Sequence, residues 1–309
     1  MIRFEQKKSR NTRYFYLTER VLLNGNYKKI QVFIGKNVPT NTRSFYATLK
    51  EKELYLLPQQ NPYTDTSLLP VHYKKVELAR IDWKYFTAQL SETRYQKLMN
   101  DFAISFIYES NAIEGSRLSQ AEVAAIVKKQ YVKKTLPRHE VQEAENAVEA
   151  FALIQSRDFT LTQKTVKELH AVVTKNLNIP TGFKKENIVI NNKQTTEPKL
   201  VKRDLKKLFV WYKENKHTIH PFERALIFHN HFEQIHPFND GNGRVGRLIL
   251  NWMLLKDGFG MILFQNQNRV AYFSALDKGD EGRYRNLLTL GQEIYVRTIT
   301  NVIGSDLQN

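Results

Sequence analysis

Hydrophobic and polar residues alternate over the first 35 or so positions, which is the pattern of β-strands with two different faces. Residues 13–18 and 29–34 are rich in aromatic and β-branched side chains, and Asn24-Gly25 lies between them. Because Asn-Gly readily adopts the left-handed backbone of a tight turn, we predict a β-hairpin in this region.

From about Leu78 onward, the hydrophobic positions recur at helical spacing instead. Glycine makes up only 13 of 309 residues, below the usual share of about 7%, which agrees with a mainly helical body. We therefore predict a mainly α fold with two parts, a small β-containing region over residues 1–78 and a helical domain over residues 79–309. The predicted helices cover about 92–112, a segment starting near 119, 140–156, 161–177, 202–215 and 221–235.

Local signals indicate where several of these elements begin and end. Gly115 can serve as the C-terminal cap of the helix at 92–112. Ser119 followed by Glu122 is the pattern of a capping box. Residues 188–190 look like a strand, and Asn191, Asn192 and Lys193 suit a turn, so we expect a small hairpin standing off the helical body.

The residues most typical of chemistry lie between His236 and Arg247. Three of the 13 glycines fall within six residues, directly before an apolar helix, where free backbone N–H groups and the helix dipole form an anion site. Arg244 and Arg247 are three residues apart, so we expect them to project toward the same anion. Asp240 offers a hard oxygen ligand for Mg²⁺, and His236 titrates near neutral pH as a general base must. These parts together predict a phosphoryl or nucleotidyl transfer site.

Three other interpretations of this loop compete with a phosphoryl or nucleotidyl transfer site. Gly241–Gly246 matches the dinucleotide fingerprint G-x-G-x-x-G, but it follows a predicted helix, and residues 264–267 lack the acidic residue expected about 20 positions on. A metal cluster is disfavoured because His229 and His231, two residues apart, point to different faces of a helix. A purely structural loop is the third alternative.

The loop resembles a known family. His236–Arg247 matches the motif HPFx[DE]GNGRxxR of Fic (Fido-fold) proteins at every fixed position, and the resemblance covers about residues 79–297. It implies a mostly helical fold and transfer of AMP from ATP to a hydroxyl side chain of a target protein. By motif position, the implied roles are a base at His236, a Mg²⁺ ligand at Asp240, a phosphate cradle at Gly241, Asn242 and Gly243, a contact to the distal phosphates at Arg244 and one to the γ-phosphate at Arg247.

A second motif resembles the inhibitory segment of that family. Residues 110–115 fit the pattern [ST]xxxE[GN] through Ser110 and Glu114, which implies an inhibitory helix over about 92–115. A Glu114 carboxylate paired with Arg247 would occupy the partner of the γ-phosphate, because charge-assisted pairs are among the stronger hydrogen bonds. We therefore expect weak basal transfer of AMP. Alternatively, Glu114 could position a water molecule for removal of AMP.

The resemblance also suggests how the substrates would be held. Residues 182–200 match the flap that binds the backbone of the target by strand addition, with Lys184 or Lys185 where Arg is frequent. Tyr272 and Phe273 occupy the place of an aromatic pair beside the adenine. Asp280 stands where the family often has Asn.

Composition adds a competing function. Lys and Arg total 47 against 31 acidic residues, giving a formal charge of +16 and a pI near 9.7, which favours polyanionic partners. The alternative is a non-catalytic basic scaffold that binds nucleotide or nucleic acid. Its nucleic-acid module would be residues 1–78, where basic residues precede Tyr14, Phe15 and Tyr16, whose rings could stack on bases. These rings could instead face a small hydrophobic core.

The remaining composition narrows the class of protein. The chain is 41% hydrophobic and 25% charged, as globular proteins are. It contains no cysteine, which excludes a disulfide framework, a thiolate metal site and a cysteine nucleophile. No apolar run reaches the roughly 20 residues of a membrane span, and residues 1–13 do not resemble a signal peptide. We expect a cytoplasmic enzyme that uses ATP and Mg²⁺, acts on an unknown target protein and can modify itself.

Overall fold

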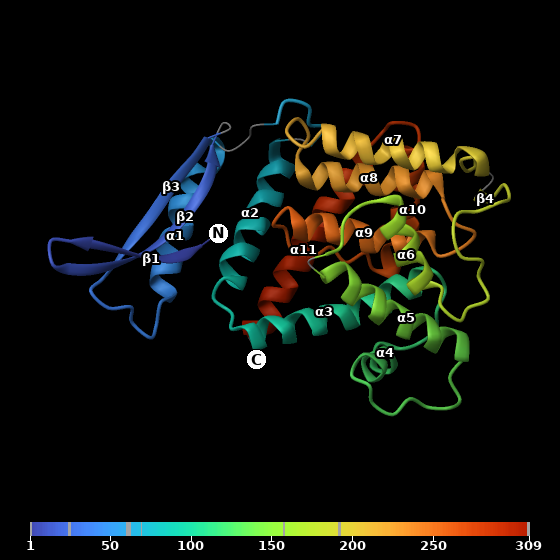
Figure 1. Ribbon diagram of the computed structural model, residues 1–309, viewed down its shortest axis with the longest axis horizontal. Helices are drawn as coiled ribbons and strands as arrows, with labels where there is room; N and C mark the ends of the chain where they lie inside the picture. Colours follow the sequence, from blue (N-terminus) through green and yellow to red (C-terminus); the bar gives the residue numbers. More distant parts are fainter. Residues whose placement is uncertain are drawn as a thin grey trace.

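The computed structural model describes residues 2–23, 26–59, 63–68, 70–156, 158–190 and 193–307. A small antiparallel sheet with one helix lies beside a larger body of helices, which confirms the mainly α fold (Figure 1). The N-terminal elements are β1 (Arg3–Ser9), β2 (Thr12–Leu23), β3 (Asn26–Gly35), α1 (Arg43–Leu56) and α2 (Pro70–Thr87).

The N-terminal sheet has three strands in the order β1-β2-β3, so the predicted hairpin is part of a meander. Its predicted Asn24-Gly25 turn lies outside the described residues, but β2 and β3 pair up to Leu23 and Asn26 on either side. Strand β1 lies within the stretch predicted to be strand-like but outside the predicted hairpin, and most of its side chains are polar and exposed. The β1–β2 turn passes through Arg10 with φ 53°.

Helix α2 connects the N-terminal region to the helical body. Its Val76 and Trp83 pack in the main hydrophobic core, whereas Ile81 and Tyr85 pack in a second core beneath the sheet. The predicted boundary between residues 78 and 79 therefore falls inside a helix with two buried faces. Helical structure begins at α1, earlier than the predicted Leu78. The sequence does not predict this start because the amphipathic pattern of α1 and α2 is weak.

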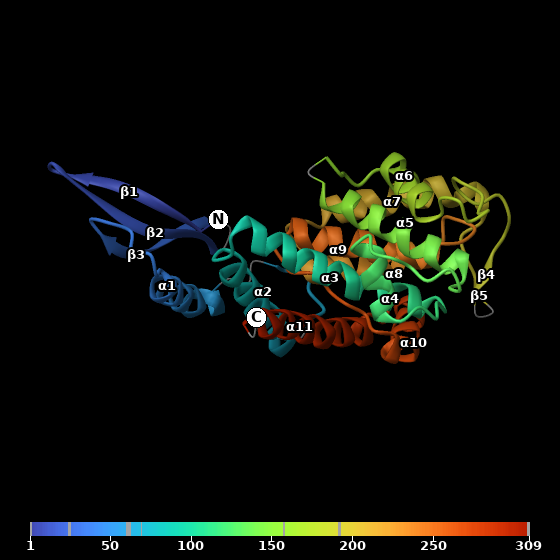
Figure 2. The ribbon, with the colours of Figure 1, turned by 90° about the horizontal axis from the view of Figure 1, so that it is seen from below.

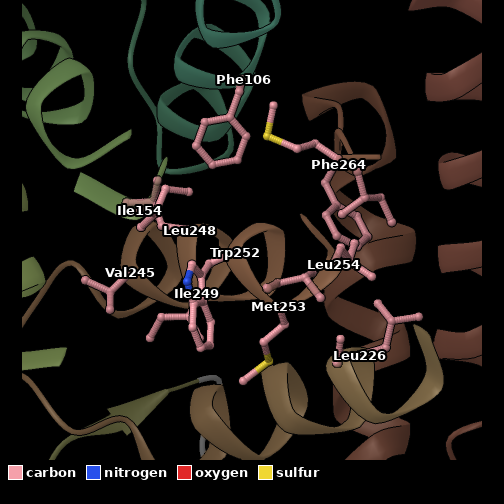
Figure 3. Close-up of a cluster of buried hydrophobic side chains, with 14 of the residues drawn as sticks. Phe106, Ile154, Leu226, Val245, Leu248, Ile249, Trp252, Met253, Leu254 and Phe264 are labelled. Atoms are coloured by element: carbon pink, nitrogen blue, oxygen red, sulfur yellow. The ribbon is translucent and has the colours of Figure 1, made fainter. Parts of the chain in front are cut away.

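The helical body surrounds one central helix, α9, which is apolar on most of its circumference. Figure 3 shows side chains of α9, among them Leu248, Ile249 and Met253, packed with Phe106 and Ile154 from two other helices. The elements of the body are α3 (Glu92–Ile113), α4 (Gln120–Val127), α5 (Arg138–Gln155), α6 (Gln163–Val173), β4 (Val189–Ile190), β5 (Lys193–Gln194), α7 (Val201–Glu214), α8 (Pro221–Ile235), α9 (Asn242–Lys256), α10 (Arg269–Gly279) and α11 (Arg285–Leu307).

Most predicted helices have ends within two residues of the observed ones. Helix α6 is shorter than the predicted 161–177, because its last residues form turns in which Asn176 and Asn178 have positive φ. The predicted hairpin near residue 190 is present as β4 and β5, although Asn191 and Asn192 of its turn lie outside the described residues. Within the described segments, no helix has the length and apolar character needed to cross a bilayer.

Both predicted capping signals are confirmed. Ser119 and Glu122 form a reciprocal capping box at the start of α4. At the end of α3, Gly115 has φ +107°, its amide bonds the carbonyl of Ala112, and the amide of Ser116 bonds the carbonyl of Asn111. This is the Schellman arrangement, in which a left-handed glycine ends the helix. Glu114, directly before Gly115, is the C-cap residue of α3.

Replacing Gly115 with Ala should destabilise the protein by about 1–2 kcal/mol. A Cβ at this position meets open space, so the cost comes from backbone strain alone. Urea unfolding measures the change, and Gly304→Ala in α11 is the matched control. That site is also open but helical, so alanine there should be neutral or stabilising by up to about 1 kcal/mol. Equal effects of the two substitutions would contradict the role given to Gly115.

Candidate active site

The loop between α8 and α9 reverses the chain through two left-handed residues. His236, the C-cap of α8, has φ 49° and ψ 64°, since the following Pro237 disfavours a continued α-helix. Gly241, the N-cap of α9, has φ +78°, and a Cβ there would lie 3.2 Å from Thr174 Cγ2. Both the positive φ and the close neighbour favour glycine at this position.

Side chains from distant segments brace the loop. Asn242 Oδ1 accepts a hydrogen bond from the amide of Phe238, and Asn242 Nδ2 donates to its carbonyl, both at 2.9 Å. His170 of α6 stacks on the Phe238 ring at 3.8 Å, and its Nε2 lies 3.0 Å from the carbonyl oxygen of Asp240. The amide of Lys184 donates to the carbonyl of Pro237 at 2.9 Å. The conformation of the loop is therefore fixed by α6 and the flap as well as by its own sequence.

The first turn of α9 opens at this loop. The first helical hydrogen bond runs from Val245 N to Gly241 O, so the amides of Asn242, Gly243 and Arg244 have no acceptor within the helix. Together with the helix dipole, these free amides are the features on which the predicted anion site depends. Because the side chain of Asn242 is bonded to Phe238, this residue can contribute to that site only through its backbone amide.

The two arginines of the loop are held by carboxylates from two other helices. Arg247 is 2% exposed, and its Nη2 donates to Glu114 Oε1 at 2.7 Å and to the carbonyl of Ser110 at 2.9 Å. Arg247 Nε donates to Ser110 Oγ at 2.9 Å. Arg244 Nη1 donates to Glu143 of α5 at 2.8 Å. A side chain at Gly243 would collide with Glu114 Oε1, so glycine is what lets this carboxylate lie against the first turn of α9.

The end of α3 is attached to the segment before α10. Arg269 Nε donates to the carbonyl of Ile113 at 2.7 Å, and the amide of Asn266 donates to Glu109 Oε2 at 2.7 Å. The position of Glu114 over α9 is thus set by contacts on both sides of the helix end.

Three side-chain nitrogens of the loop are buried without a hydrogen-bond partner. They are His236 Nδ1, Arg244 Nε and Arg247 Nη1. Most buried polar atoms in proteins have partners, and a loop with a purely structural role would be expected to satisfy them. Unpaired nitrogens also occur on Arg224 and His220 away from the loop, so it is the position of these three beside the first turn of α9 that favours an anionic ligand.

His236 is half-buried, and its surroundings keep it neutral. Burial, and next the nearby positive charge of Lys184, lower the pKa of the imidazole to about 4. Lys184 is itself 3% exposed, its pKa is lowered to about 8 by burial, and its Nζ donates to Thr195 Oγ1 at 2.5 Å. At neutral pH, His236 is therefore in the form that can accept a proton.

Asp240 has a largely exposed side chain (63%), and its Oδ1 accepts from the amide of Gly241 at 2.5 Å. The described part of the chain contains no group of three or more His, Cys, Asp or Glu side chains that could hold a metal ion. A single carboxylate suits Mg²⁺ only when phosphate oxygens and waters complete the coordination. The residues present therefore fit an ion that binds together with a nucleotide.

The two predicted adenine contacts differ in exposure. Tyr272 is 1% exposed, with its hydroxyl 2.6 Å from His229 Nε2, so its ring belongs to the core in this conformation. Phe273 is half-buried, and the Arg269 guanidinium lies over its ring at 5.1 Å. Of the two, only Phe273 presents a partly accessible ring.

The two histidines of α8 have different partners. His231 contacts Tyr284, whereas His229 contacts Tyr272, so the two side chains are not directed to one common ion.

The β4–β5 hairpin, within the predicted flap, is held at its base and beside its turn. Thr195 bonds the carbonyl of Ile188 through its amide and hydroxyl, which closes the base of the hairpin. Lys193 of β5 forms an ion pair with Asp277 of α10 at 2.8 Å, and Asp280 lies 3.7 Å from the same ammonium group. Val189 of β4 is 57% exposed.

Several of these supporting residues could not be predicted from the sequence. Glu143 is 101 positions from Arg244, and His170 is 70 positions from Asp240. Neither lies in a motif, so only the packing of α5 and α6 against α9 brings them to the loop.

The proton affinity of His236 can be measured directly. In ¹³C-labelled protein, the His236 imidazole should titrate well below pH 6.5, with a midpoint near 4, because burial and Lys184 both oppose protonation. Lys184→Met should raise the midpoint, and His236→Gln assigns the signal. A midpoint of about 6.5 in the native chain would contradict this electrostatic assignment.

Comparison with known proteins finds a family match for part of the chain and several relatives. Residues 160–254 match the Fic/DOC family. The chain is 32% identical over 152 residues to a probable protein adenylyltransferase of Aquifex aeolicus, covering 48% of this chain and 47% of that protein. It is 27% identical over 224 residues to protein adenylyltransferase fic-1 of Caenorhabditis elegans, covering 69% and 44%. The chain thus spans about half the length of the curated relatives it matches.

Solved structures share the fold. A fragment of Fic-1 from C. elegans superposes with a TM-score of 0.69 at 22% identity, covering 87% of this chain and 79% of that one. A Fic domain containing signaling protein from Bacteroides thetaiotaomicron gives 0.68 at 20% identity, covering 74% and 95%. At this level of identity the likeness concerns the fold alone. The sequence match over residues 160–254 and the motif from His236 to Arg247 identify a Fic/DOC domain in this part of the chain.

Proposed function

We propose that this chain is a protein adenylyltransferase that transfers AMP from ATP to a hydroxyl side chain of a target protein. The observation that carries the proposal is the cluster of unpaired nitrogens on His236, Arg244 and Arg247 around the first turn of α9. A base and an anion cradle at one place are what attack on a phosphate requires. The names of the curated relatives, protein adenylyltransferases, support the same reaction.

In the proposed reaction, neutral His236 takes the proton of the target hydroxyl. The hydroxyl oxygen then attacks the α-phosphorus of ATP, the bond from that phosphorus to the bridging oxygen breaks, and pyrophosphate leaves. The amides of Asn242 and Gly243 and the side chain of Arg244 would hold phosphate oxygens, and Arg247 would contact the γ-phosphate. Gly241 shapes the cradle through its left-handed backbone.

Asp240 would hold Mg²⁺ together with phosphate oxygens, and the ion would neutralise part of the phosphate charge. Its exposed carboxylate at the mouth of the loop supports this assignment. Phe273 would lie against the adenine, with Tyr272 supporting it from the core. The exposed edges of β4 and β5 would bind the target backbone by strand addition, and the anchoring of Lys184 to Pro237 would place that strand beside His236.

We also propose that Glu114 inhibits this reaction. Arg247 is almost fully buried, and its Nε and Nη2 are directed to Ser110 and Glu114, so a γ-phosphate that binds Nη2 would have to displace the carboxylate. Since a buried guanidinium needs a counter-charge, the carboxylate and the phosphate compete for one partner. The result is a low basal rate.

Removal of AMP is a second activity that this arrangement supports. The Glu114 side chain is 37% exposed and lies over the first turn of α9, where it could orient a water molecule toward an AMP-modified target. Incubation of AMP-modified protein with the native chain and with Glu114→Gly tests it. Loss of AMP with the native chain alone is the expected result.

Replacing Glu114 with Gly should increase the transfer of label from α-³²P-ATP to protein, including to the chain itself, by roughly 5- to 150-fold, the usual range of a regulatory coupling. Glu114→Gln, which keeps the size and removes the charge, should give a smaller increase. Asp101→Gly removes an exposed carboxylate and adds the same flexibility elsewhere in α3, and it should activate much less. If Asp101→Gly activates as strongly as Glu114→Gly, loosening of the helix and not loss of the Glu114 carboxylate explains the effect.

His236→Ala in the Glu114→Gly background should reduce transfer by a factor of about 10² to 10⁴, because the general base is lost. Nucleotide binding, measured by calorimetry in the presence of Mg²⁺, should change little. This pair of measurements separates the enzyme from a non-catalytic basic scaffold. Unchanged labelling after His236→Ala would refute the transferase assignment.

A further inference from the structure

The N-terminal sheet has one covered face and one open face. Leu17 and Val21 of β2 and Ile30 and Val32 of β3 pack on α1 in the smaller hydrophobic core. Figure 2 shows α1 along that face and no described element on the opposite one. Side chains at alternating strand positions therefore extend into solvent on the open face.

Three aromatic rings gather on the open face. The rings of Tyr14 and Tyr16 lie 5.8 Å and 5.3 Å from that of Phe33, and none of the three is part of the smaller core. Phe33 is 54% exposed, and Tyr14 and Tyr16 are half-buried. The expectation that aromatic residues of this stretch face a small core is therefore wrong for Tyr14 and Tyr16, because strand alternation directs them away from Leu17.

Positive charge surrounds these rings. Residues 2–35 contain eight Lys and Arg against two Glu. Glu19 is 5% exposed and lies on the covered face, because it alternates with core-facing Leu17 and Val21 along β2. Glu5 is paired with Lys29 and Arg3. Lys7 Nζ lies 4.6 Å from the centre of the Tyr16 ring. The open face thus combines accessible aromatic rings with more cations than carboxylates, since Arg3 and Lys29 share the single carboxylate of Glu5.

We propose that the open face of the β1–β2–β3 sheet binds single-stranded nucleic acid. Bases would stack on Tyr14 and Phe33, while Lys7, Lys29 and Arg20 would contact the phosphates, which is how sheet surfaces with aromatic residues recognise single strands. A duplex offers no free base faces to these rings. A protein partner fits less well, because interfaces between proteins are depleted in lysine, and here lysine lies among the rings.

This site is separate from the loop at His236. In Figure 1 the sheet lies at the opposite end of the molecule from β4 of the flap, with α2 between the sheet and the helical body. Binding of nucleic acid therefore does not require transfer of AMP, and the two proposals can fail independently.

The test is the fluorescence anisotropy of a labelled 20-nucleotide oligo(dT) titrated with the full chain at several salt concentrations. Tyr14→Ala with Phe33→Ala should weaken binding about tenfold or more, because two stacking platforms are lost. Lys7→Ala with Lys29→Ala should also reduce the slope of log K against log salt, by about 0.7 for each phosphate contact removed. Duplex DNA should bind more weakly than oligo(dT) and be insensitive to the aromatic substitutions.

Matched controls come from the same chain. Tyr55 and Tyr131 are each 80% exposed outside the sheet, and Lys206 and Lys207 are exposed on α7. Alanine at these pairs should leave oligo(dT) binding within about twofold, and thermal unfolding should show that every variant is folded. Equal losses in the control pairs would mean a diffuse basic surface and would overturn the proposal. Polyglutamate binding that depends on Tyr14 and Phe33 as strongly as oligo(dT) binding does would overturn it in favour of an acidic protein partner.

Discussion

The buried guanidinium of Arg247 is the constraint on which the functional end of the molecule depends. A charge at 2% exposure needs a counter-charge, and Glu114 supplies one at 2.7 Å. Burial opposes the charge on Arg247, but the carboxylate keeps its pKa above the ordinary value for arginine. The same guanidinium is the proposed partner of the γ-phosphate. The need of Arg247 for a counter-charge is therefore also the reason why Glu114 and ATP would compete for it.

That ion pair is possible only because two helix ends meet closely. Gly243 leaves room for the carboxylate at the start of α9, and the left-handed Gly115 ends α3 directly after Glu114. Arg269 binds the last carbonyl of α3, and Phe106 of the same helix packs in the core beside α9. The segment proposed to be inhibitory is therefore an integral part of the main core, so releasing Glu114 need not unfold it.

The two proposed activities lie on opposite sides of α2. This helix packs in the main core through Trp83 and beneath the sheet through Ile81, which makes the N-terminal region continuous with the helical body. The chain thus carries a basic, aromatic surface on one side of α2 and the proposed nucleotide site on the other. A polyanion bound to the sheet would hold the molecule in place without entering the loop at His236.

The amino-acid sequence by itself determined the features that depend on neighbours in the chain. These are the helix from Pro221 to Ile235, the capping box at Ser119, the glycine stop at Gly115 and the motif from His236 to Arg247, because propensity, capping and turn chemistry act over a few residues. The mainly helical fold followed from the same local patterns.

Only the tertiary structure decided which distant groups meet. It brought Glu143 to Arg244 and His170 to Asp240, and it buried Tyr272, where the motif alone suggested an adenine contact. It also gave the sheet its third strand and directed Tyr14 and Tyr16 to solvent. The physical reason is that these outcomes depend on how helices and strands far apart in the sequence pack together, and the hydrophobic pattern of one segment does not contain its packing partner.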